Sequence, residues 1–502
     1  MRFAQTTLGC KVNQYDSNAI AEILRGLGFS SATEGESAGL AVINTCCITH
    51  VAMRKSRQAI RRVVRRSGAD SLIVAGCYGD YDAQQLARSV ESLHIPPGRV
   101  LVCGHHDDLA ETISRFARSL LAGGATSATA RTANEPAGCG GDKGYEPSMQ
   151  ASASPVGTDA YPGRSPHTIR ARRIRAVKEK TPAASGLPPI SEFEGRQRAF
   201  VKIQDGCDAF CTYCIVPFTR ARVYSRPADE IVRECRTLIE TGHREIVLCG
   251  VFLGAYGRDT TLRRNWDGSA DQLPDLLARV GQMDGLWRVR LSSLEPADVT
   301  GRLLDVARRL PTFAPHVHLP LQSGSERILK KMNRQYSADD FRRSVRRIRD
   351  AFDRPAVTAD VIVGFPEETE EDFRQTLEMA REAGFSKIHA FPFSPREGTA
   401  AWGRKDRMPD PQTVRARMDR LAELEAELSI EYRRQFVGEQ VEGIVEESAG
   451  ADGSRIAMTD RYLTVAFNPP AGEESELTGL PVRLRIIRLT DGGFAGEFID
   501  CC

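Results

Sequence analysis

Three cysteines stand close together near the middle of the chain, in the run Cys207-Asp-Ala-Phe-Cys211-Thr-Tyr-Cys214. The run directly follows Phe200–Ile203, a short apolar stretch that is typical of a buried β-strand. Three thiolates on one short loop can bind three irons of a four-iron cluster and leave the fourth iron for a small molecule. The fold therefore has to present this loop at the end of a strand, beside space for a ligand.

Strand and helix patterns alternate over residues 197–435, with helical patterns such as Pro227–Thr241 and Ala338–Phe352. This alternation predicts a parallel βα barrel or part-barrel, whose functional site lies at the C-terminal ends of the strands. The expected strands are Phe200–Ile203, Glu245–Leu248, Trp287–Leu291, His316–Leu319, Val357–Val363 and Lys387–Phe391.

The N-terminal part, to about residue 120, also alternates, with buried strands expected at Ala41–Asn44 and Ser71–Ala75. This pattern predicts a small α/β domain with a parallel sheet. Cys10, Cys46 and Cys77 each fall where an expected strand ends. Because the ends of parallel strands lie along one edge of a sheet, these cysteines could meet in space.

The remaining patterns suggest how the rest of the chain is divided. We expect helices over Ser17–Leu27 and Gln412–Phe436, and a small C-terminal β-barrel from alternating runs such as Val482–Ile487. Residues 122–190 are dominated by Gly, Ala, Ser, Thr and Pro without periodicity, which predicts a flexible insert or linker. The later part of this insert is basic, which fits a solvated linker or an RNA-contacting arm.

The overall charge is nearly balanced, with 68 Lys and Arg against 66 Asp and Glu, so the chain as a whole is not a polyanion binder. No apolar run reaches the roughly eighteen residues that a membrane span needs. The N-terminus is too polar for a signal peptide, and we expect a cytoplasmic protein without a membrane partner. Cysteines stay reduced in that compartment, so clustered ones indicate metal or redox chemistry.

An iron–sulfur cluster explains the central cysteine run better than its rivals do. A zinc site needs four protein ligands, and no fourth ligand is adjacent. A thioredoxin-type pair uses two cysteines, not three. S-adenosylmethionine (SAM) can chelate the open iron through its amino and carboxylate groups, and an electron from the cluster would cleave it to a carbon radical.

The motifs around these cysteines resemble one family, the radical-SAM methylthiotransferases. The resemblance covers nearly the whole chain except 122–190, and it implies an N-terminal domain (1–121), a radical-SAM part-barrel (191–436) and a C-terminal RNA-binding TRAM barrel (437–502). The motifs that carry it are Leu8-Gly-Cys-Lys-Val-Asn-Gln-Tyr-Asp-Ser17, Asn44-Thr-Cys46, Gly76-Cys-Tyr78, Leu291-Ser-Ser-Leu-Glu-Pro296 and His318-Leu-Pro-Leu-Gln-Ser-Gly324.

The resemblance also assigns roles to individual residues. Cys207, Cys211 and Cys214 would hold one 4Fe-4S cluster and Cys10, Cys46 and Cys77 a second. Cys47 is a departure from the family pattern and could compete with Cys46 as a ligand. The residues implied to line the SAM site are Tyr213, Gly250, Ser292, Glu295, Ile362 and Gly364.

Within the family, the sequence after Cys10 resembles the branch that acts on N6-threonylcarbamoyladenosine at position 37 of tRNA. The implied reaction adds a methylthio group at C2 of that base. The implied partners are a tRNA anticodon stem-loop and a low-potential flavodoxin or ferredoxin. Residues offered as an RNA or substrate surface are Arg220, Arg222, Arg226, Gln322 and Ser323.

Three alternatives stay open at this point. Two are methylthiolation of isopentenyladenosine-37 in tRNA and of ribosomal protein S12. The third is a non-catalytic, redox-sensing RNA-binding protein, which would not cleave SAM. The basic residues that follow Cys46, such as Arg54, Arg61 and Arg65, fit a solvated helix face and an RNA surface equally well.

Overall fold

The computed structural model describes residues 1–33, 35–105, 108–123, 186–193, 197–266, 271–449, 453–470 and 477–502. Most of the predicted insert therefore lies outside the described residues. Its last five residues, 186–190, are described, and Ile190 is buried and donates its N–H to the Glu234 carboxylate at 2.7 Å. The packed part of the barrel region thus begins before residue 191, where the sequence boundary was placed.

The N-terminal domain is a five-stranded parallel sheet in the order β2-β1-β3-β4-β5, as predicted. The first helix begins at Lys11, directly after Cys10 at its N-cap position, and it contains most of the helical stretch expected through Ser17–Leu27. The strands are β1 (Arg2–Thr7), β2 (Ser30–Ser31), β3 (Leu40–Thr45), β4 (Ser71–Gly76) and β5 (Val100–Val102). The helices are α1 (Lys11–Gly26), α2 (His50–Ser67), α3 (Cys77–Glu91) and α4 (Leu109–Leu121).

The central domain is an open part-barrel of six parallel strands, and every strand expected from the sequence is present. Two ladders, β6-β8-β9 and β10-β11-β12, are joined by single bridges such as Ser293↔His318. The strands are β6 (Arg198–Asp205), β8 (Glu245–Gly250), β9 (Arg288–Leu291), β10 (His316–His318), β11 (Ala356–Val363) and β12 (Lys387–Pro392), and a short strand β7 (Tyr224–Ser225) pairs antiparallel with β6.

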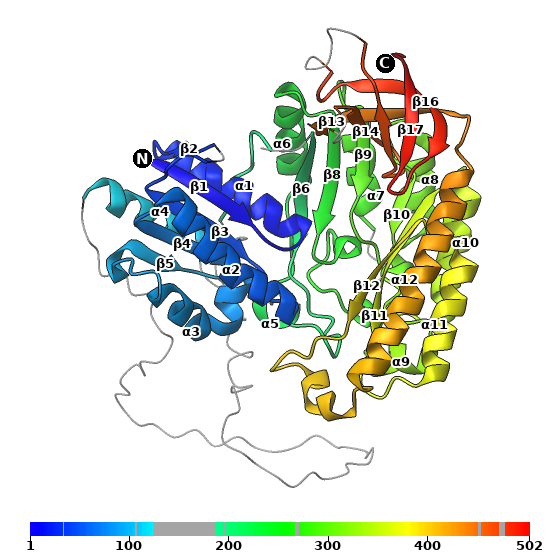
Figure 1. Cartoon of the computed structure of the whole chain (residues 1–502), viewed down its shortest axis with the longest axis horizontal. Coiled ribbons are helices and arrows are strands. Elements are labelled where there is room, and N and C mark those ends of the chain that lie inside the picture. The colour runs from blue at the N-terminus through cyan, green and yellow to red at the C-terminus, as the bar shows by residue number, and fades with distance from the viewer. Residues whose placement is uncertain are drawn as a thin grey trace.

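Helices cover the outside of this part-barrel, and α10, α11 and α12 run side by side along one flank (Figure 1). Their apolar faces and the outward faces of the strands form the largest hydrophobic core. The helices are α5 (Val216–Thr219), α6 (Ala228–Glu240), α7 (Leu273–Gly281), α8 (Gly301–Arg309), α9 (Glu326–Lys331), α10 (Ala338–Ala351), α11 (Glu370–Ala383) and α12 (Pro411–Arg434).

The C-terminal domain is a closed five-stranded barrel with the strand order β13-β14-β15-β17-β16, which confirms the predicted small barrel. Arg290 of β9 is fully buried beneath it, pairs with Glu245, and donates to the Thr459 carbonyl at 2.7 Å. The strands are β13 (Gln440–Ala449), β14 (Arg455–Thr459), β15 (Thr464–Phe467), β16 (Pro481–Leu489) and β17 (Phe494–Cys501). In the described part of the chain, no helix combines the length and apolarity that crossing a membrane requires.

Candidate active site

The central cysteine run forms a compact loop after β6, at the C-terminal end of the part-barrel. Gly206 opens the loop with a φ of +77°, and a Cβ there would lie 1.7 Å from the Arg222 carbonyl oxygen, so only glycine fits. The Cys214 N–H donates to the Cys211 carbonyl at 2.9 Å and turns the loop back on itself. The backbone therefore holds the three thiols close together.

Two other segments hold the loop in place. The Asp208 carboxylate accepts hydrogen bonds of 2.6 Å from both the N–H and the hydroxyl of Thr261, whose Oγ1 lies 3.5 Å from Cys207 Sγ. On the other side, Asn333 donates its side-chain amide to the Phe210 carbonyl at 3.1 Å. Rigid placement of this kind is what a ligand loop for a cluster needs.

Arg334 is a central residue of this site that the sequence did not reveal. Its side chain is only 7% exposed, and it donates to Cys211 Sγ at 3.0 Å and to Tyr213 Oη at 3.2 Å. It also pairs with both carboxylate oxygens of Glu295. Cys211 and Arg334 are 123 positions apart, so no local spacing pattern could have linked them.

The positions expected to line a SAM site all lie near this end of the part-barrel. Arg334 joins Tyr213 to Glu295, while the other four stand at or just after the ends of β8, β9 and β11. In the described structure, Ser292 Oγ and Arg334 Nε are buried without a hydrogen-bond partner. Unpaired buried polar atoms are costly, so this region fits a polar ligand beside the cysteine loop. The four strand-end residues are Gly250, Ser292, Ile362 and Gly364.

The donor set fits an iron–sulfur cluster. Burial raises the pKa of Cys207 to about 11, so this thiol is protonated at neutral pH and would lose its proton only on binding a metal. Among the described residues, no three His, Cys, Asp or Glu side chains converge on one point that could hold a single metal ion. A four-iron cluster does not require such convergence, because each thiolate binds a different iron.

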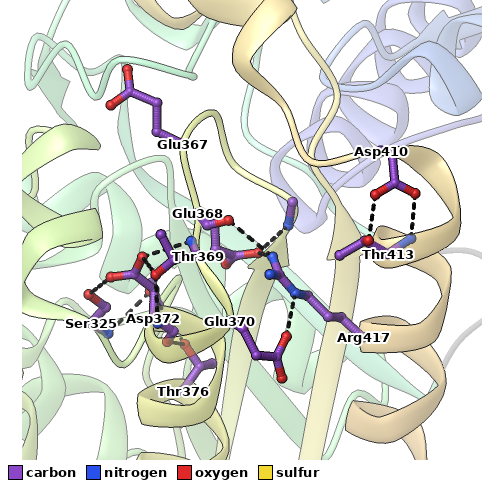
Figure 2. A network of polar contacts seen from close by, with 12 residues as sticks. Ser325, Glu367, Glu368, Thr369, Glu370, Asp372, Thr376, Asp410, Thr413 and Arg417 are labelled. Atoms are coloured by element: carbon purple, nitrogen blue, oxygen red, sulfur yellow. Dashed lines mark hydrogen bonds and ion pairs between the residues drawn. The ribbon is translucent and has the colours of Figure 1, made fainter.

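The loop after β11 is held by a buried ion pair shown in Figure 2. Gly364 has a φ of +80°, and its N–H donates to the Glu368 carboxylate at 2.8 Å. Arg417 of α12 pairs with Glu368 at 2.9 Å and also reaches Glu370. Helix α12 therefore fixes the conformation of a loop at the mouth of the part-barrel.

The three N-terminal cysteines gather at one edge of their sheet. Cys10 precedes α1, Cys46 follows β3, and Cys77 follows β4, whose Gly76 pairs in register with Thr45. A Cβ on Gly9 would lie 3.3 Å from Cys46 Sγ, which shows how closely the segment before Cys10 approaches Cys46. The structure thus brings together three thiols that the sequence separates by more than sixty positions.

The two adjacent cysteines after β3 have different surroundings. Cys47 is completely buried in an apolar cluster, and its Sγ donates to the Cys77 carbonyl at 3.3 Å. Cys46 retains 8% exposure, and its Sγ would lie 3.3 Å from a Cβ on Gly9, so it borders the segment that leads to Cys10. These surroundings favour Cys46 as the ligand over Cys47, which packs as a small apolar residue.

Two arginines proposed as an RNA surface are instead internal. Arg220 is 5% exposed and pairs with Asp16 at 2.7 Å and with Asp205 at 2.8 Å. Arg226 pairs with the buried Glu234 at 2.6 Å. Both contact the N-terminal domain, Arg220 through Asp16 and Arg226 through Tyr15 Oη at 3.0 Å, so their guanidinium groups are engaged inside the protein. The sequence shows the charge of these arginines but not the carboxylates that pair with them, which is why they were expected on an RNA surface.

The other three proposed substrate contacts differ from one another. Ser323 is fully buried and lies against Thr376 Oγ1 at 3.4 Å, so it does not face a substrate. Gln322 is partly buried, has a φ of +59°, and bridges to Val361 of β11. Arg222 is exposed, 5.9 Å from the ring of Tyr224.

Two family models match the chain: the radical SAM superfamily over residues 201–380, and uncharacterized protein family UPF0004 over residues 2–95. The chain is also 32% identical over 496 residues to a Bacillus subtilis (strain 168) protein named threonylcarbamoyladenosine tRNA methylthiotransferase MtaB. That match covers 98% of this chain and 95% of the relative. The chain belongs to the radical-SAM tRNA methylthiotransferases.

Other relatives of this methylthiotransferase carry two different names. A Chlamydia pneumoniae protein, also named MtaB, is 32% identical, and the match covers 99% of this chain and 98% of the relative. An Alkaliphilus oremlandii (strain OhILAs) protein named tRNA-2-methylthio-N(6)-dimethylallyladenosine synthase is 30% identical, with 99% and 93% coverage. The family is therefore shown, whereas identity alone does not separate the two kinds of tRNA base.

Proposed function

We propose that this methylthiotransferase adds a methylthio group to C2 of N6-threonylcarbamoyladenosine at position 37 of tRNA. The observation that carries the two-cluster chemistry is the pair of separate three-cysteine groups, one on the N-terminal sheet edge and one on the barrel loop. The substrate rests on the motif that begins at Cys10 and on the names of the relatives from Bacillus subtilis and Chlamydia pneumoniae.

In this proposal each cysteine group holds one 4Fe-4S cluster, on Cys207, Cys211 and Cys214 and on Cys10, Cys46 and Cys77. Bound clusters and SAM supply hydrogen abstraction at an unactivated C–H bond and a source of sulfur. Arg334 holds positive charge against the Cys211 thiolate and fixes Glu295 and Tyr213 beside it. The protein's own part is to position the base between the two groups and to exclude water.

The partners follow from the same reaction. The tRNA anticodon stem-loop would approach the open side of the part-barrel, where Gln322 and Arg222 would lie at the edge. The C-terminal barrel would bind another part of the RNA. Reduction of the clusters requires a low-potential donor of the flavodoxin or ferredoxin type. Binding of tRNA should weaken steeply as salt concentration rises, because phosphate contacts release counterions.

The deciding experiment is nucleoside mass spectrometry of tRNA from a strain that lacks this gene, compared with its parent. We expect the methylthio form to disappear and threonylcarbamoyladenosine to remain. Complementation with the wild-type gene should restore the methylthio form, whereas a Cys211→Ala gene should not. Loss of a methylthio isopentenyladenosine instead would assign the other tRNA base, and an unchanged tRNA profile would direct the search to ribosomal protein S12.

A further inference from the structure

A cavity of about 520 Å³ lies on the inward side of the part-barrel, away from the barrel cysteine loop. Strands β10, β11 and β12 form one wall, and the start of α1, helix α12 and two loops of the C-terminal barrel form the others. This volume is in the range of small-molecule sites. The polar side chains used below are Lys11, His316, His318, Thr358, Lys387 and His389.

The inward faces of β11 and β12 are apolar at one end of the strands and polar or basic at the other. Thr358 pairs with Lys387 and Ile362 pairs with Phe391, and alternate residues of a strand share one face. The rise per residue places Thr358 and Ile362 roughly 13 Å apart. Phe391, near the end of β12, is 44% exposed, and its ladder partner Ile362 belongs to the same apolar cluster as Tyr213 of the cysteine loop. The face therefore runs from an apolar, aromatic end near the expected SAM site to a basic end in the cavity.

Lys11 is the cation of the cavity whose charged group has no partner among the described residues, whereas the other cations have a carboxylate or carbonyl partner. Lys387 pairs with Glu425 at 2.8 Å, and Arg461 pairs with Asp460 at 2.6 Å. Arg433 donates to backbone carbonyls of the C-terminal barrel. The side-chain ammonium of Lys11 forms no hydrogen bond or ion pair with any residue that the structure describes.

The histidines add hydrogen-bond donors beside this charge. His316 is buried, its Nε2 lies 3.3 Å from Thr358 Oγ1, and its Nδ1 has no partner among the described residues. His318 sits between Thr358 at 2.9 Å and Asp360 at 3.3 Å. Burial lowers the pKa of His316 and of His389, so both rings are neutral at pH 7 and each carries one N–H.

We infer that this cavity binds a carboxylate carried on the side chain of the target base, with Lys11 as its counter-ion and Phe391 stacking on the base. The inference rests on the proposed function, because threonylcarbamoyladenosine carries such a carboxylate on N6. Flipped-out RNA bases are typically stacked on aromatic side chains, and the exposed face of Phe391 offers that surface. A tRNA backbone phosphate has the same anionic oxygen chemistry, and the experiment has to separate the two.

The test uses full-length protein with both clusters reconstituted and three anticodon stem-loop RNAs that differ only at position 37. They carry threonylcarbamoyladenosine, its methyl ester, or unmodified adenosine. We expect wild-type protein to bind the acid at least tenfold more tightly than the ester. Lys11→Met should bind acid and ester equally, Lys11→Arg should keep the preference, and Lys55→Met, on the exposed face of α2, should match wild type.

Phe391→Ala should weaken binding of acid and ester alike, by about tenfold, and leave their ratio unchanged. Iron content and the electron paramagnetic resonance spectrum of each variant check that a change next to Cys10 has not removed the second cluster. The inference is overturned if Lys11→Met keeps the full preference for the acid. It is also overturned if Lys11→Met weakens binding of unmodified RNA by the same factor, since Lys11 would then contact a phosphate.

Failure of the proposed function would give a different result. In that case wild-type protein would turn over an isopentenyladenosine stem-loop and leave the threonylcarbamoyl RNA unmodified, whatever Lys11 does to binding.

Discussion

Replacement of Arg220 by methionine should destabilise the contact between the N-terminal domain and the part-barrel. Arg220 and Lys202 face Asp16 and Asp205, so the buried network has two positive and two negative charges. The side chains of Arg220 and Asp16 are 3% and 1% exposed, so solvent screens them little. The substitution leaves one buried negative charge without a counter-ion.

Removing one partner of a buried ion pair costs about 3–5 kcal/mol, and we expect the lower end because Lys202 still contacts both carboxylates. For a domain of about 150–250 residues, a loss of about 3 kcal/mol in the free energy of unfolding lowers Tm by roughly 6–12 °C. The assay is differential scanning fluorimetry of the reconstituted protein under anaerobic conditions, with exposed Arg222→Gln as the matched control. A second substitution, Asp16→Asn, should recover part of the loss in the Arg220→Met protein, because it restores charge balance.

One result would refute this reasoning. If Arg220→Met melts within about 2 °C of Arg222→Gln and also lowers the salt slope of tRNA binding by about one, Arg220 is a phosphate contact. The earlier assignment of Arg220 to the RNA surface would then stand.

Three further predictions concern the cysteine groups. Cys211→Ala should abolish SAM cleavage and leave far-ultraviolet circular dichroism unchanged, and retained cleavage would contradict the cluster assignment. Cys46→Ala should lower the iron content from about eight to about four per chain, two four-iron clusters being reduced to one, whereas Cys47→Ala should keep both; the reverse pattern would make Cys47 the ligand. Arg334→Met should keep the barrel cluster but slow SAM cleavage at least tenfold, because Glu295 and Tyr213 lose the group that holds them; unchanged cleavage, measured by chromatography of the adenosine product, would show that Arg334 only packs.

The parts of the fold that the sequence predicted are those that local patterns determine. Short apolar runs located all six parallel strands of the part-barrel, because a parallel sheet covered by helices buries its strands on both faces, whereas the two-residue strand β7 is too short to give a pattern. The exact first residue of α1 has no signal in the apolar pattern, because the turn at Gly9 and Cys10 sets the helix boundary. Likewise, Ile190 lies in a stretch whose composition gives no sign of burial.

The sequence predicted the site residues whose type alone indicates their role. It did not predict those whose role depends on which residues they contact in the fold. A cysteine in a C-x₃-C-x₂-C loop has few other uses, so its role can be read from the sequence. An arginine can contact phosphate, a carboxylate or a thiol with the same side chain, and the choice depends on distant residues. The sequence therefore assigned Arg220 and Arg226 to the wrong surface and did not indicate Arg334. Each of the three contacts a residue of a motif that the sequence had singled out: Asn13, Tyr15 and Cys211, respectively.

The arrangement of these arginines bears on how the two cysteine groups work together. Arg220 donates to Asn13 Oδ1 at 2.9 Å and places its positive charge close to Cys77, while its carboxylate partner Asp205 ends the strand that leads into the Cys207 loop. A single buried network thus connects the N-terminal cysteine edge to the barrel loop. Rotating one domain against the other would have to break these ion pairs. The network therefore holds the two cysteine groups in one relative position, and the proposed substrate base would have to bind without a rotation of the domains.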